Sequence, residues 1–386
     1  MVALVLAAAS LAVWLYLVFA RGFFWLARER DDAAVAPLPA ALPSVAIVVP
    51  ARNEADNIAQ SVTSLLGQDY PALSLIVVDD DSSDGTADIA RRTAASLCAE
   101  SKLSIIESHA LPERWTGKLW AVKQGIAAAE ESFAPTYLML TDADIVHAGD
   151  TLRWLVAQAE AHNLVLTSLT ARWRCEGFAE RVHIPAFIYF FQMLYPFAWV
   201  NRPDHPMAGA AGGCMLVRAD ALRAAGGIEV IRDALIDDCT LAAAMKKQGP
   251  IWVGLTDRSV SVRPYASWTD MRRMIARSAY AQLQYSPLLL AGTILGMVLT
   301  YLVPVFAALF AHGWAQLVGA LTWALMALSF QPTLRLYRLS PLWGVALPAI
   351  SFLFMLYTLD SAYQYFAGKG GSWKGRVQAK AHDHGR

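Results

Sequence analysis

The sequence predicts an α/β domain with a mostly parallel sheet, flanked by transmembrane helices at both ends. The chain has 386 residues, of which 56% are hydrophobic and only 17% charged. That composition is too apolar for an ordinary soluble protein, and the excess is concentrated at the two ends. In the middle of the chain, short β-branched runs alternate with helical patterns, which is typical of a parallel sheet covered on both faces.

The charge balance and the cysteines exclude two classes of protein. Lys and Arg number 32 against 32 Asp and Glu, so the formal net charge is zero. The chain therefore lacks the excess of positive charge that would indicate nucleic-acid binding. The four cysteines form no C-x-x-C pair and no disulfide-dense pattern, and we expect reduced thiols that face the cytosol.

Residues 1–30 are predicted to form an uncleaved membrane anchor. The stretch from Val2 to Ala20 is uncharged and about one span long. A cleaved signal peptide carries its basic residues before the apolar stretch, whereas here Arg21, Arg28 and Arg30 follow it. These arginines mark the cytoplasmic side. Residues 31–43, rich in Ala and Pro, are predicted as a linker.

Residues 286–360 are predicted to form three further membrane helices. No Asp, Glu, Lys or Arg occurs from 278 to 334, which is room for two spans with a turn near Gly313. A second uncharged run, residues 339–359, predicts one more span. Arg335 and Arg338 lie between the last two spans and are expected on the cytoplasmic side, with the middle domain.

The side of the basic tail, residues 361–386, stays open at this point. Four crossings place the tail outside, although the positive-inside rule favours the cytoplasm for so basic a segment. Residues 184–200 offer a further crossing, but Pro185, Gln192 and Pro196 interrupt the apolar run. We therefore favour an interfacial or re-entrant segment for these residues.

Acidic residues follow three predicted strands in the middle domain, residues 44–285. The strands are the apolar runs at 45–49, 75–78 and 137–140. In such sheets, ligands bind beyond the carboxyl ends of the strands. The segments that follow the strands are Pro50-Ala-Arg-Asn-Glu54, Asp79-Asp-Asp-Ser-Ser-Asp84 and Thr141-Asp-Ala-Asp144.

These acids suit a nucleotide only in certain arrangements. The chain has neither a G-x-G-x-x-G after the first strand nor a P-loop, so bare phosphate binding is not supported. Asp79 and Asp80 can accept hydrogen bonds from a uracil imide and ribose hydroxyls. Asp142 and Asp144 can share Mg²⁺ or Mn²⁺. Asp81 and Asp84 suit a turn equally well.

The motifs resemble those of family 2 glycosyltransferases, which have the GT-A fold. The segment at 50–54 is similar to the P-x-x-N-E signature of the uridine site, and the segment at 77–86 is similar to V-V-D-D-x-S-x-D-G-T. Gly117-Lys118 with Ala121 and Gly125 resembles G-K-x-x-A-x-x-x-G, and the acids at 142 and 144 match the metal-binding D-x-D. The resemblance implies that Asp144 and Asp142 hold the metal. It implies a donor site made of Pro50, Ala51, Asn53, Glu54, Asp79, Asp80, Lys118 and Asp142.

The later half of the domain continues the resemblance. Gly212-Gly213, Gly226-Gly227 and the pair Asp237-Asp238 resemble the small-residue wall, the turn and the base motif of the family. The resemblance implies that Asp238 is the general base of an inverting displacement, which needs a carboxylate to take the acceptor proton. The alternative is that either acid caps the helix expected at 239–248.

One motif departs from the family pattern. Ceramide glucosyltransferases and related synthases carry [QR]-x-x-R-W, but the corresponding segment here, residues 272–278, has no tryptophan in either register. That puts a processive polysaccharide synthase in doubt. Arg273 and Arg277 remain expected contacts of the donor diphosphate, with a basic helix face at the membrane surface as the alternative.

Over nearly its full length the chain most resembles bacterial hopanoid-biosynthesis-associated glycosyltransferases, which are related to ceramide glucosyltransferases. The residues that carry this likeness are Trp115-Thr-Gly-Lys-Leu-Trp120, the segment 273–283 and the Gly-Lys-rich tail up to Arg376. The resemblance implies transfer from a UDP-sugar to a lipid hydroxyl at the cytoplasmic face of the bacterial inner membrane. Partners would be a nucleotide sugar, a lipid acceptor and the bilayer, with Mg²⁺ or Mn²⁺ as cofactor.

Three alternatives remain open from the sequence. The first is a related glycosyltransferase that acts on polyprenyl phosphate or on a sphingoid or ceramide acceptor. The second is a transporter, which is disfavoured because His312 is the single ionisable residue in the predicted spans. The third is a catalytically silent membrane scaffold. The sugar, the lipid and the oligomeric state are not specified by the sequence.

Overall fold

The computed structural model describes residues 1–32 and 37–371, which divide into two compact units. We call the part made of Glu29–Arg174 and Trp199–Pro264 the sheet unit. The helical unit contains Met1–Arg28, Cys175–Ala198 and the described chain from Tyr265 onward. Residues 175–198 and 265–285, which the sequence assigns to the middle domain, therefore group with the apolar helices.

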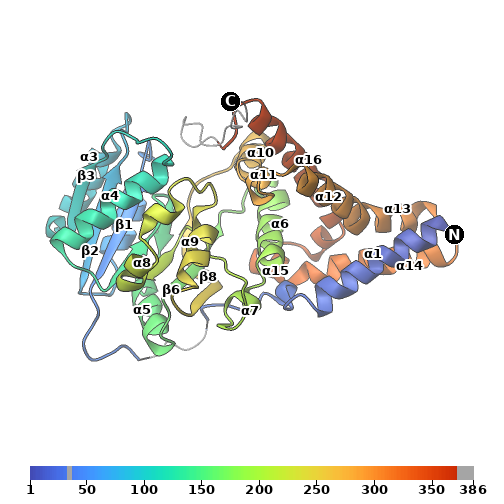
Figure 1. Cartoon of the computed structure of the whole chain (residues 1–386), viewed down its shortest axis with the longest axis horizontal. Helices are drawn as coiled ribbons and strands as arrows, with labels where there is room; N and C mark the ends of the chain where they lie inside the picture. The colour runs from blue at the N-terminus through green and yellow to red at the C-terminus, as the bar shows by residue number, and fades with distance from the viewer. Residues whose placement is uncertain (33–36, 372–386) are drawn as a thin grey trace. The chain divides into compact units, whose positions relative to one another are not determined.

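The sheet unit is built on an eight-stranded sheet with the order β3-β2-β1-β4-β7-β6-β8-β5 (Figure 1). Strands β3, β2, β1 and β4 are parallel to one another, and β6 is parallel to β8. Antiparallel pairing occurs between β4 and β7, β7 and β6, and β8 and β5. The predicted mostly parallel sheet is confirmed. The strands are β1 (Val45–Ala51), β2 (Leu73–Asp79), β3 (Leu103–Glu107), β4 (Tyr137–Leu140), β5 (Ile145–His147), β6 (Leu166–Trp173), β7 (Met215–Arg218) and β8 (Ile251–Ser261).

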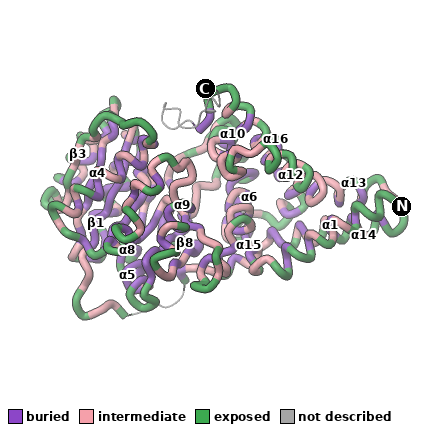
Figure 2. Tube along the Cα trace, viewed as in Figure 1, coloured by how far each residue is buried: buried purple, intermediate pink, exposed green. Residues whose placement is uncertain are grey.

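The central strands are buried because helices cover the sheet. All seven residues of β1 are buried, and Figure 2 shows the strands as the buried centre of this unit. The register pairs Ala51 of β1 with Asp79 of β2, so the carboxyl ends of these strands meet at one edge. Helices of the unit are α2 (Ile58–Leu66), α3 (Thr86–Ser96), α4 (Gly117–Ser132), α5 (Thr151–Ala161), α8 (Ala219–Ala224) and α9 (Asp237–Met245), with short turns η2 (Glu100–Lys102) and η3 (Ile228–Ile231).

Helix α4 packs closely on β1 and β2 because its inward face is made of small residues. Ala121 is fully buried. A Cβ atom at Gly125 would lie 2.4 Å from Val48 Cγ1 and 2.9 Å from Val78 Cγ2. The spacing of the G-K-x-x-A-x-x-x-G segment therefore has a packing reason, since it lets α4 approach the sheet while Lys118 lies in its first turn.

The helical unit contains the apolar ends of the chain. Helices α1, α13 and α14 run beside one another (Figure 1). Aromatic and aliphatic side chains, among them Trp14, Tyr189 and Phe330, form its buried core. Its elements are α1 (Val2–Phe19), η1 (Phe24–Leu26), α6 (Phe178–Leu194), α10 (Trp268–Ala276), α11 (Ala279–Gln282), α12 (Pro287–Met297), the π-helical η4 (Val298–Leu302), α13 (Val303–Phe310), α14 (Trp314–Ser329), α15 (Gln331–Leu336), η5 (Pro341–Gly344) and α16 (Leu347–Phe366). Helix α7 (Phe197–Val200) joins the two units along the chain.

Three helical segments of the described chain are long and apolar enough to cross a membrane. They are Val2–Phe19, Pro287–Phe310 and Trp314–Leu336, which correspond to the first three spans expected from the sequence. The fourth expected span, residues 339–359, overlaps α16, which begins later and is not among these segments. Membrane association is therefore plausible, and the fourth crossing stays a prediction.

Residues 184–200 lie mostly in α6, which continues through Pro185 with most of its residues buried. The fully buried Glu180 accepts hydrogen bonds from the backbone N–H groups of Gly177 and Tyr265, at 2.9 Å each. Glu180 thereby links the two later segments of the helical unit. The tail motif from Ser372 to Arg376 lies outside the described residues.

Candidate active site

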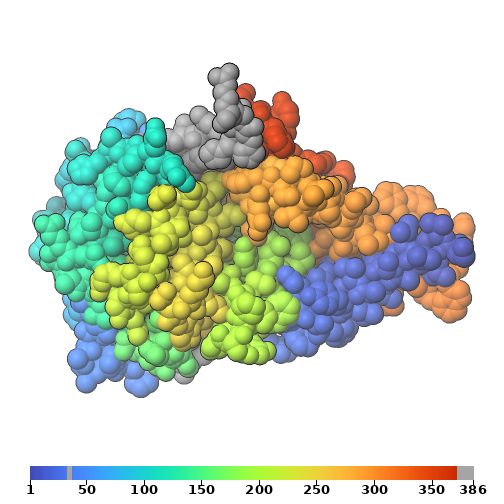
Figure 3. All heavy atoms as spheres, in the orientation of Figure 1, coloured from blue at the N-terminus to red at the C-terminus, as the bar shows by residue number. Residues whose placement is uncertain are grey.

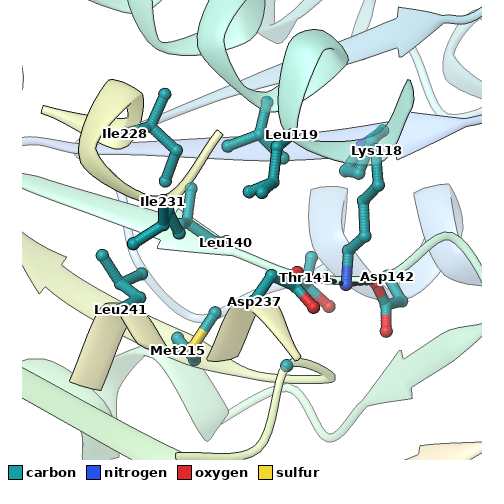
Figure 4. Close-up of a pocket in the computed structure, with 13 residues that line it drawn as sticks. Lys118, Leu119, Leu140, Thr141, Asp142, Met215, Ile228, Ile231, Asp237 and Leu241 are labelled. Atoms are coloured by element: carbon teal, nitrogen blue, oxygen red, sulfur yellow. Dashed lines mark ion pairs between the residues drawn. The ribbon is translucent and has the colours of Figure 1, made fainter. Parts of the chain in front are cut away.

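Lys118 joins two of the acidic segments at the edge of the sheet. Its Nζ lies 2.9 Å from Asp142 Oδ1 and 3.0 Å from Asp237 Oδ2 (Figure 4). Asp142 follows β4, Asp237 is the first residue of α9, and Lys118 is in the first turn of α4. Burial lowers the pKa of Lys118, but the two carboxylates outweigh burial and hold its pKa above the usual value. The lysine is therefore a fixed positive charge among the acids.

Asp238 lies beside this cluster with its carboxylate held by the backbone. Its Oδ2 accepts a hydrogen bond from Gly212 N at 2.9 Å, and its Oδ1 lies 2.7 Å from Cys239 N. Burial, together with the neighbouring Asp237 carboxylate, raises the pKa of Asp238 to about 6, although Lys118 acts in the opposite direction. Such a carboxyl group changes protonation near neutral pH, as a general base needs to do.

Neither Asp237 nor Asp238 is the N-cap residue of the helix, as the capping alternative would require. Helix α9 begins at Asp237, with Ile236 at its N-cap and no side-chain cap hydrogen bond. Both acids lie in the first turn of the helix, where its partial positive charge favours carboxylates. The backbone of Gly212 lies directly beside both groups, since a Cβ there would be in ordinary contact with Asp238 Oδ2 at 3.5 Å and with Lys118 Nζ at 3.4 Å.

Asp144 is paired with a residue that sequence reasoning missed. Arg263 Nε lies 2.5 Å from Asp144 Oδ2, and Arg263 Nη2 lies 2.6 Å and 2.8 Å from the two oxygens of Glu54. Arg263 follows β8 and stands in no motif, so only the pairing of distant strands brings it here. Glu54 and Asp144, predicted as donor and metal residues, are thus brought together by a guanidinium.

The loops after β1 and β2 are tied together by the predicted donor residues. Asn53 Oδ1 accepts a hydrogen bond from Ser83 N at 2.9 Å, and Asn53 N donates to Ser82 Oγ at 3.0 Å. Pro50 and Ala51 form the end of β1 and Asp79 the end of β2. Asp80 is only 2% exposed, with Arg52 Nη1 3.8 Å from its Oδ2.

The turn alternative fits Asp84, whose carboxylate accepts hydrogen bonds from the backbone N–H groups of Ala55 and Thr86. Asp81 is 84% exposed and has a positive φ of 57°.

A buried polar network lies behind the D-x-D acids and was also missed. Thr141 Oγ1 donates to Gly213 O at 2.7 Å and lies 2.9 Å from His147 Nε2. His147 Nδ1 lies 2.9 Å from Ser259 Oγ. Since the Thr141 hydroxyl has one proton, its contact with His147 requires Nε2 to be the protonated ring nitrogen. Burial lowers the pKa of His147 to about 3, so the ring stays neutral and holds β4, β5 and β8 together.

Arg273 and Arg277 belong to the helical unit. Arg273 lies in α10, and Arg277 follows its last residue. Their contact with a donor diphosphate stays a prediction.

A pocket opens beside Lys118 between α4, η3 and α9. Most of its wall is apolar, from residues such as Leu119, Ile231 and Leu241, and its polar rim is formed by Lys118, Asp142 and Asp237 (Figure 4). The surface of α4 adjoins that of η3 (Figure 3), and a hydrogen bond from Thr116 N to Arg232 O joins these segments.

A comparison with family models decides the class of this domain. Residues 46–226 match the model described as Glycosyl transferase family 2. This part of the chain therefore corresponds to a family 2 glycosyltransferase domain. The matched residues contain the acidic strand ends, Lys118 and the Gly212-Gly213 wall, while the acids at 237 and 238 follow them. No curated protein matches the sequence.

One solved structure supports the GT-A fold of this domain, and two others show a weaker likeness. The chain is similar to the mannosyltransferase PcManGT from Pyrobaculum calidifontis in complex with GDP-Man and Mn²⁺, with 20% identity, a TM-score of 0.56, and coverage of 94% of this chain and 98% of that one. TarS residues 1–349 from S. aureus in complex with UDP-GlcNAc are 14% identical over 83% of this chain and 92% of that one, with a TM-score of 0.41. The M. tuberculosis glucosyl-3-phosphoglycerate synthase is 17% identical over 62% and 80%, with a TM-score of 0.39. The fold assignment rests on the first.

Proposed function

We propose that this glycosyltransferase moves a sugar from a nucleotide-sugar donor, specifically a UDP-sugar, to the hydroxyl of a membrane lipid with inversion at the anomeric carbon. The observation that carries the proposal is the set of carboxylates around Lys118 at the edge of the sheet, with Asp238 held beside it. The PcManGT structure, determined with GDP-Man and Mn²⁺, supports a nucleotide-sugar donor of this general class.

In this proposal Asp238 is the general base. The acceptor hydroxyl gives its proton to the Asp238 carboxylate, while its oxygen forms a bond to the anomeric carbon. The bond from that carbon to the diphosphate breaks, and its electron pair leaves with the nucleoside diphosphate. Gly212 suits this step because its backbone N–H holds one oxygen of the Asp238 carboxylate in place. Lys118 supplies positive charge for the leaving diphosphate.

A divalent cation fits the donor set in part. Asp144 and Asp142 offer the hard oxygen ligands that Mg²⁺ and Mn²⁺ prefer. Within the described residues no group of three His, Cys, Asp or Glu side chains is arranged to hold a metal alone, so a diphosphate would complete the ligands. When bound, the ion would neutralise charge on the leaving group.

The proposed acceptor is a polycyclic hopanoid-type lipid at the cytoplasmic face of a bacterial inner membrane. The support is the full-length resemblance described above and the three helices able to cross a membrane. Aromatic residues of α6 such as Phe187 and Phe190 suit an interfacial role.

The chemistry is tested with purified protein, a panel of UDP-sugars with GDP-mannose for comparison, and extracted lipids. Asp238→Asn and Asp144→Asn should fold normally and lose transfer, by about two orders of magnitude or more. Asp69→Asn is the matched control, because Asp69 is an exposed acid of the same unit paired with Arg153. Transfer at the wild-type rate by Asp238→Asn would refute the assigned base.

The acceptor is tested with matched lipids. A hydroxylated hopanoid should accept the sugar, whereas ceramide and polyprenyl phosphate should not. Sugar transfer to polyprenyl phosphate alone would favour the phosphate-acceptor alternative and refute the lipid hydroxyl.

A further inference from the structure

We propose that Arg263 is the built-in counter-ion of the metal site, and that it must leave Asp144 for a divalent cation to bind there. This inference rests on the proposed metal-assisted function and adds a residue that controls it. Arg263 Nε contacts Asp144 at 2.5 Å, and its Nη2 contacts both oxygens of Glu54. One guanidinium thus occupies the carboxylate assigned to the metal.

The Arg263 guanidinium and a divalent metal ion would compete for the Asp144 carboxylate, for reasons of both charge and geometry. Asp144 Oδ2 already accepts a charge-assisted hydrogen bond from Arg263, and these are among the strongest in proteins. A divalent ion placed on the same carboxylate would lie next to a positive guanidinium, in a site where Asp144 is 14% exposed and Glu54 8%. Repulsion between charges is poorly screened in such surroundings. Arg263 should therefore weaken the affinity of the site for a free metal ion.

The Arg263 side chain also has room and a second partner that would let it move away from Asp144. Its side chain is 28% exposed, and Glu54 holds it in a two-point contact that does not involve Asp144. The guanidinium can turn away from Asp144 while it keeps this second partner. Its released N–H donors suit the oxygens of a diphosphate. The metal would therefore bind well together with the nucleotide sugar and poorly without it.

Lys118 differs from Arg263 in this respect. Its Nζ lies between Asp142 and Asp237, so loss of one contact leaves it in an ion pair with another acid of the reaction centre. Arg263 has no such link to Asp237 or Asp238 among the described ion pairs. Substituting Arg263 therefore removes the partner of Asp144, the proposed metal ligand, while Lys118 stays in place beside Asp238.

The experiment is a titration of the full-length detergent-solubilised protein with Mn²⁺ alone, in which the electron paramagnetic resonance signal of free Mn²⁺ reports binding. Arg263→Met should bind Mn²⁺ at least about tenfold more tightly than the wild type, and Arg263→Lys should stay near the wild type. Arg258→Met is the matched control. Arg258 is a similarly buried arginine of β8 that pairs with Asp31 and Asp150, so its loss should leave Mn²⁺ affinity unchanged.

Equal or weaker Mn²⁺ binding by Arg263→Met overturns the inference, as does an absence of Mn²⁺ binding by every variant. If Arg263→Met does not fold, Arg263→Gln tests the same point, because it also removes the positive charge but keeps a side-chain N–H donor for Glu54, and it should tighten Mn²⁺ binding as well. The titration contains neither sugar nor lipid, so its outcome is independent of the transfer assay. Normal sugar transfer by the wild type with unchanged Mn²⁺ affinity in both variants would reject the inference and leave the proposed function standing.

Discussion

The protonation of the Asp238 carboxyl group should set the pH dependence of sugar transfer. Burial and Asp237 raise its pKa to about 6, so it is protonated below that pH and can then accept no proton. We expect kcat/KM to fall about tenfold per pH unit below pH 6 and to level off above pH 7, because this ratio reports the free enzyme. Initial rates measured from pH 4.5 to 8 test this. A profile that is flat down to pH 4.5 would contradict the assignment.

Lys118 should shift that same profile. Its positive charge opposes the rise in the pKa of Asp238, so Lys118→Met removes a stabilising charge from the ionised base. The midpoint of the kcat/KM profile should move upward from about 6, and the rate at pH 7 should fall. Lys123→Met is the control, because Lys123 lies on the same helix but pairs with Glu229. A lowered rate with an unmoved midpoint would assign Lys118 to donor binding alone.

At the scale of single residues, the sequence predicted those that follow strand ends in recognisable motifs. Asp142 and Asp144 follow a predicted strand and Lys118 stands in a recognisable motif, and the ion pair of Lys118 with Asp142 brings these two motifs together. Arg263 and His147 were missed because their partners lie far away along the chain. Arg263 is 119 positions from Asp144, and Ser259 is 112 from His147. No local pattern marks a residue whose role comes from the pairing of β5 with β8.

Helix α4 owes its position to a glycine, which makes the element sensitive to one methyl group. A Cβ at Gly125 would lie 2.4 Å from Val48 Cγ1, and β-branched neighbours in a packed sheet yield little. We expect Gly125→Ala to destabilise the protein by about 1–2 kcal/mol, because overpacking exceeds the gain in helix propensity. Displacement of α4 should also lower transfer through Lys118.

Thermal unfolding of the detergent-solubilised protein measures the effect of Gly125→Ala. The control is Gly292→Ala in α12, where an added Cβ meets nothing within 4 Å, and its Tm should stay the same or rise. An unchanged Tm for Gly125→Ala would mean that α4 can move away from the sheet at little cost.

At the scale of helices and strands, the sequence predicted those that are long or fully buried. The runs that became β1, β2 and β4 are continuous and apolar, and all three were predicted. The edge strand β3 was not, because Leu103–Glu107 is short and has no buried residue. Pro185 led us to expect an interruption, yet α6 continues through it. Proline removes one helical hydrogen bond, and packing within the helical unit offsets that loss.

At the scale of the whole molecule, α16 bears on the open question of the tail. Arg272 of α10 forms an ion pair with Asp360 of α16 at 2.7 Å, and Tyr280 N donates to Ser361 Oγ at 3.0 Å. The carboxyl end of α16 thus lies beside α10 and α11, which precede the segment Pro287–Phe310 along the chain. If both Pro287–Phe310 and Trp314–Leu336 cross the membrane, they return the chain to the side on which α10 began. An α16 that starts and ends on this side would then not cross the membrane.

The tail is therefore expected on the cytoplasmic side, together with the catalytic domain. This placement removes the conflict with the positive-inside rule, since Lys369 and the basic residues after it then face the cytoplasm. A fluorescent protein fused after Arg386 should fluoresce in a bacterial host, and alkaline phosphatase at the same point should be inactive. Alkaline phosphatase inserted at Gly313, between α13 and α14, should be active as the control. An active phosphatase after Arg386 would restore the fourth crossing, because only an odd number of spans after α11 carries the tail across the membrane.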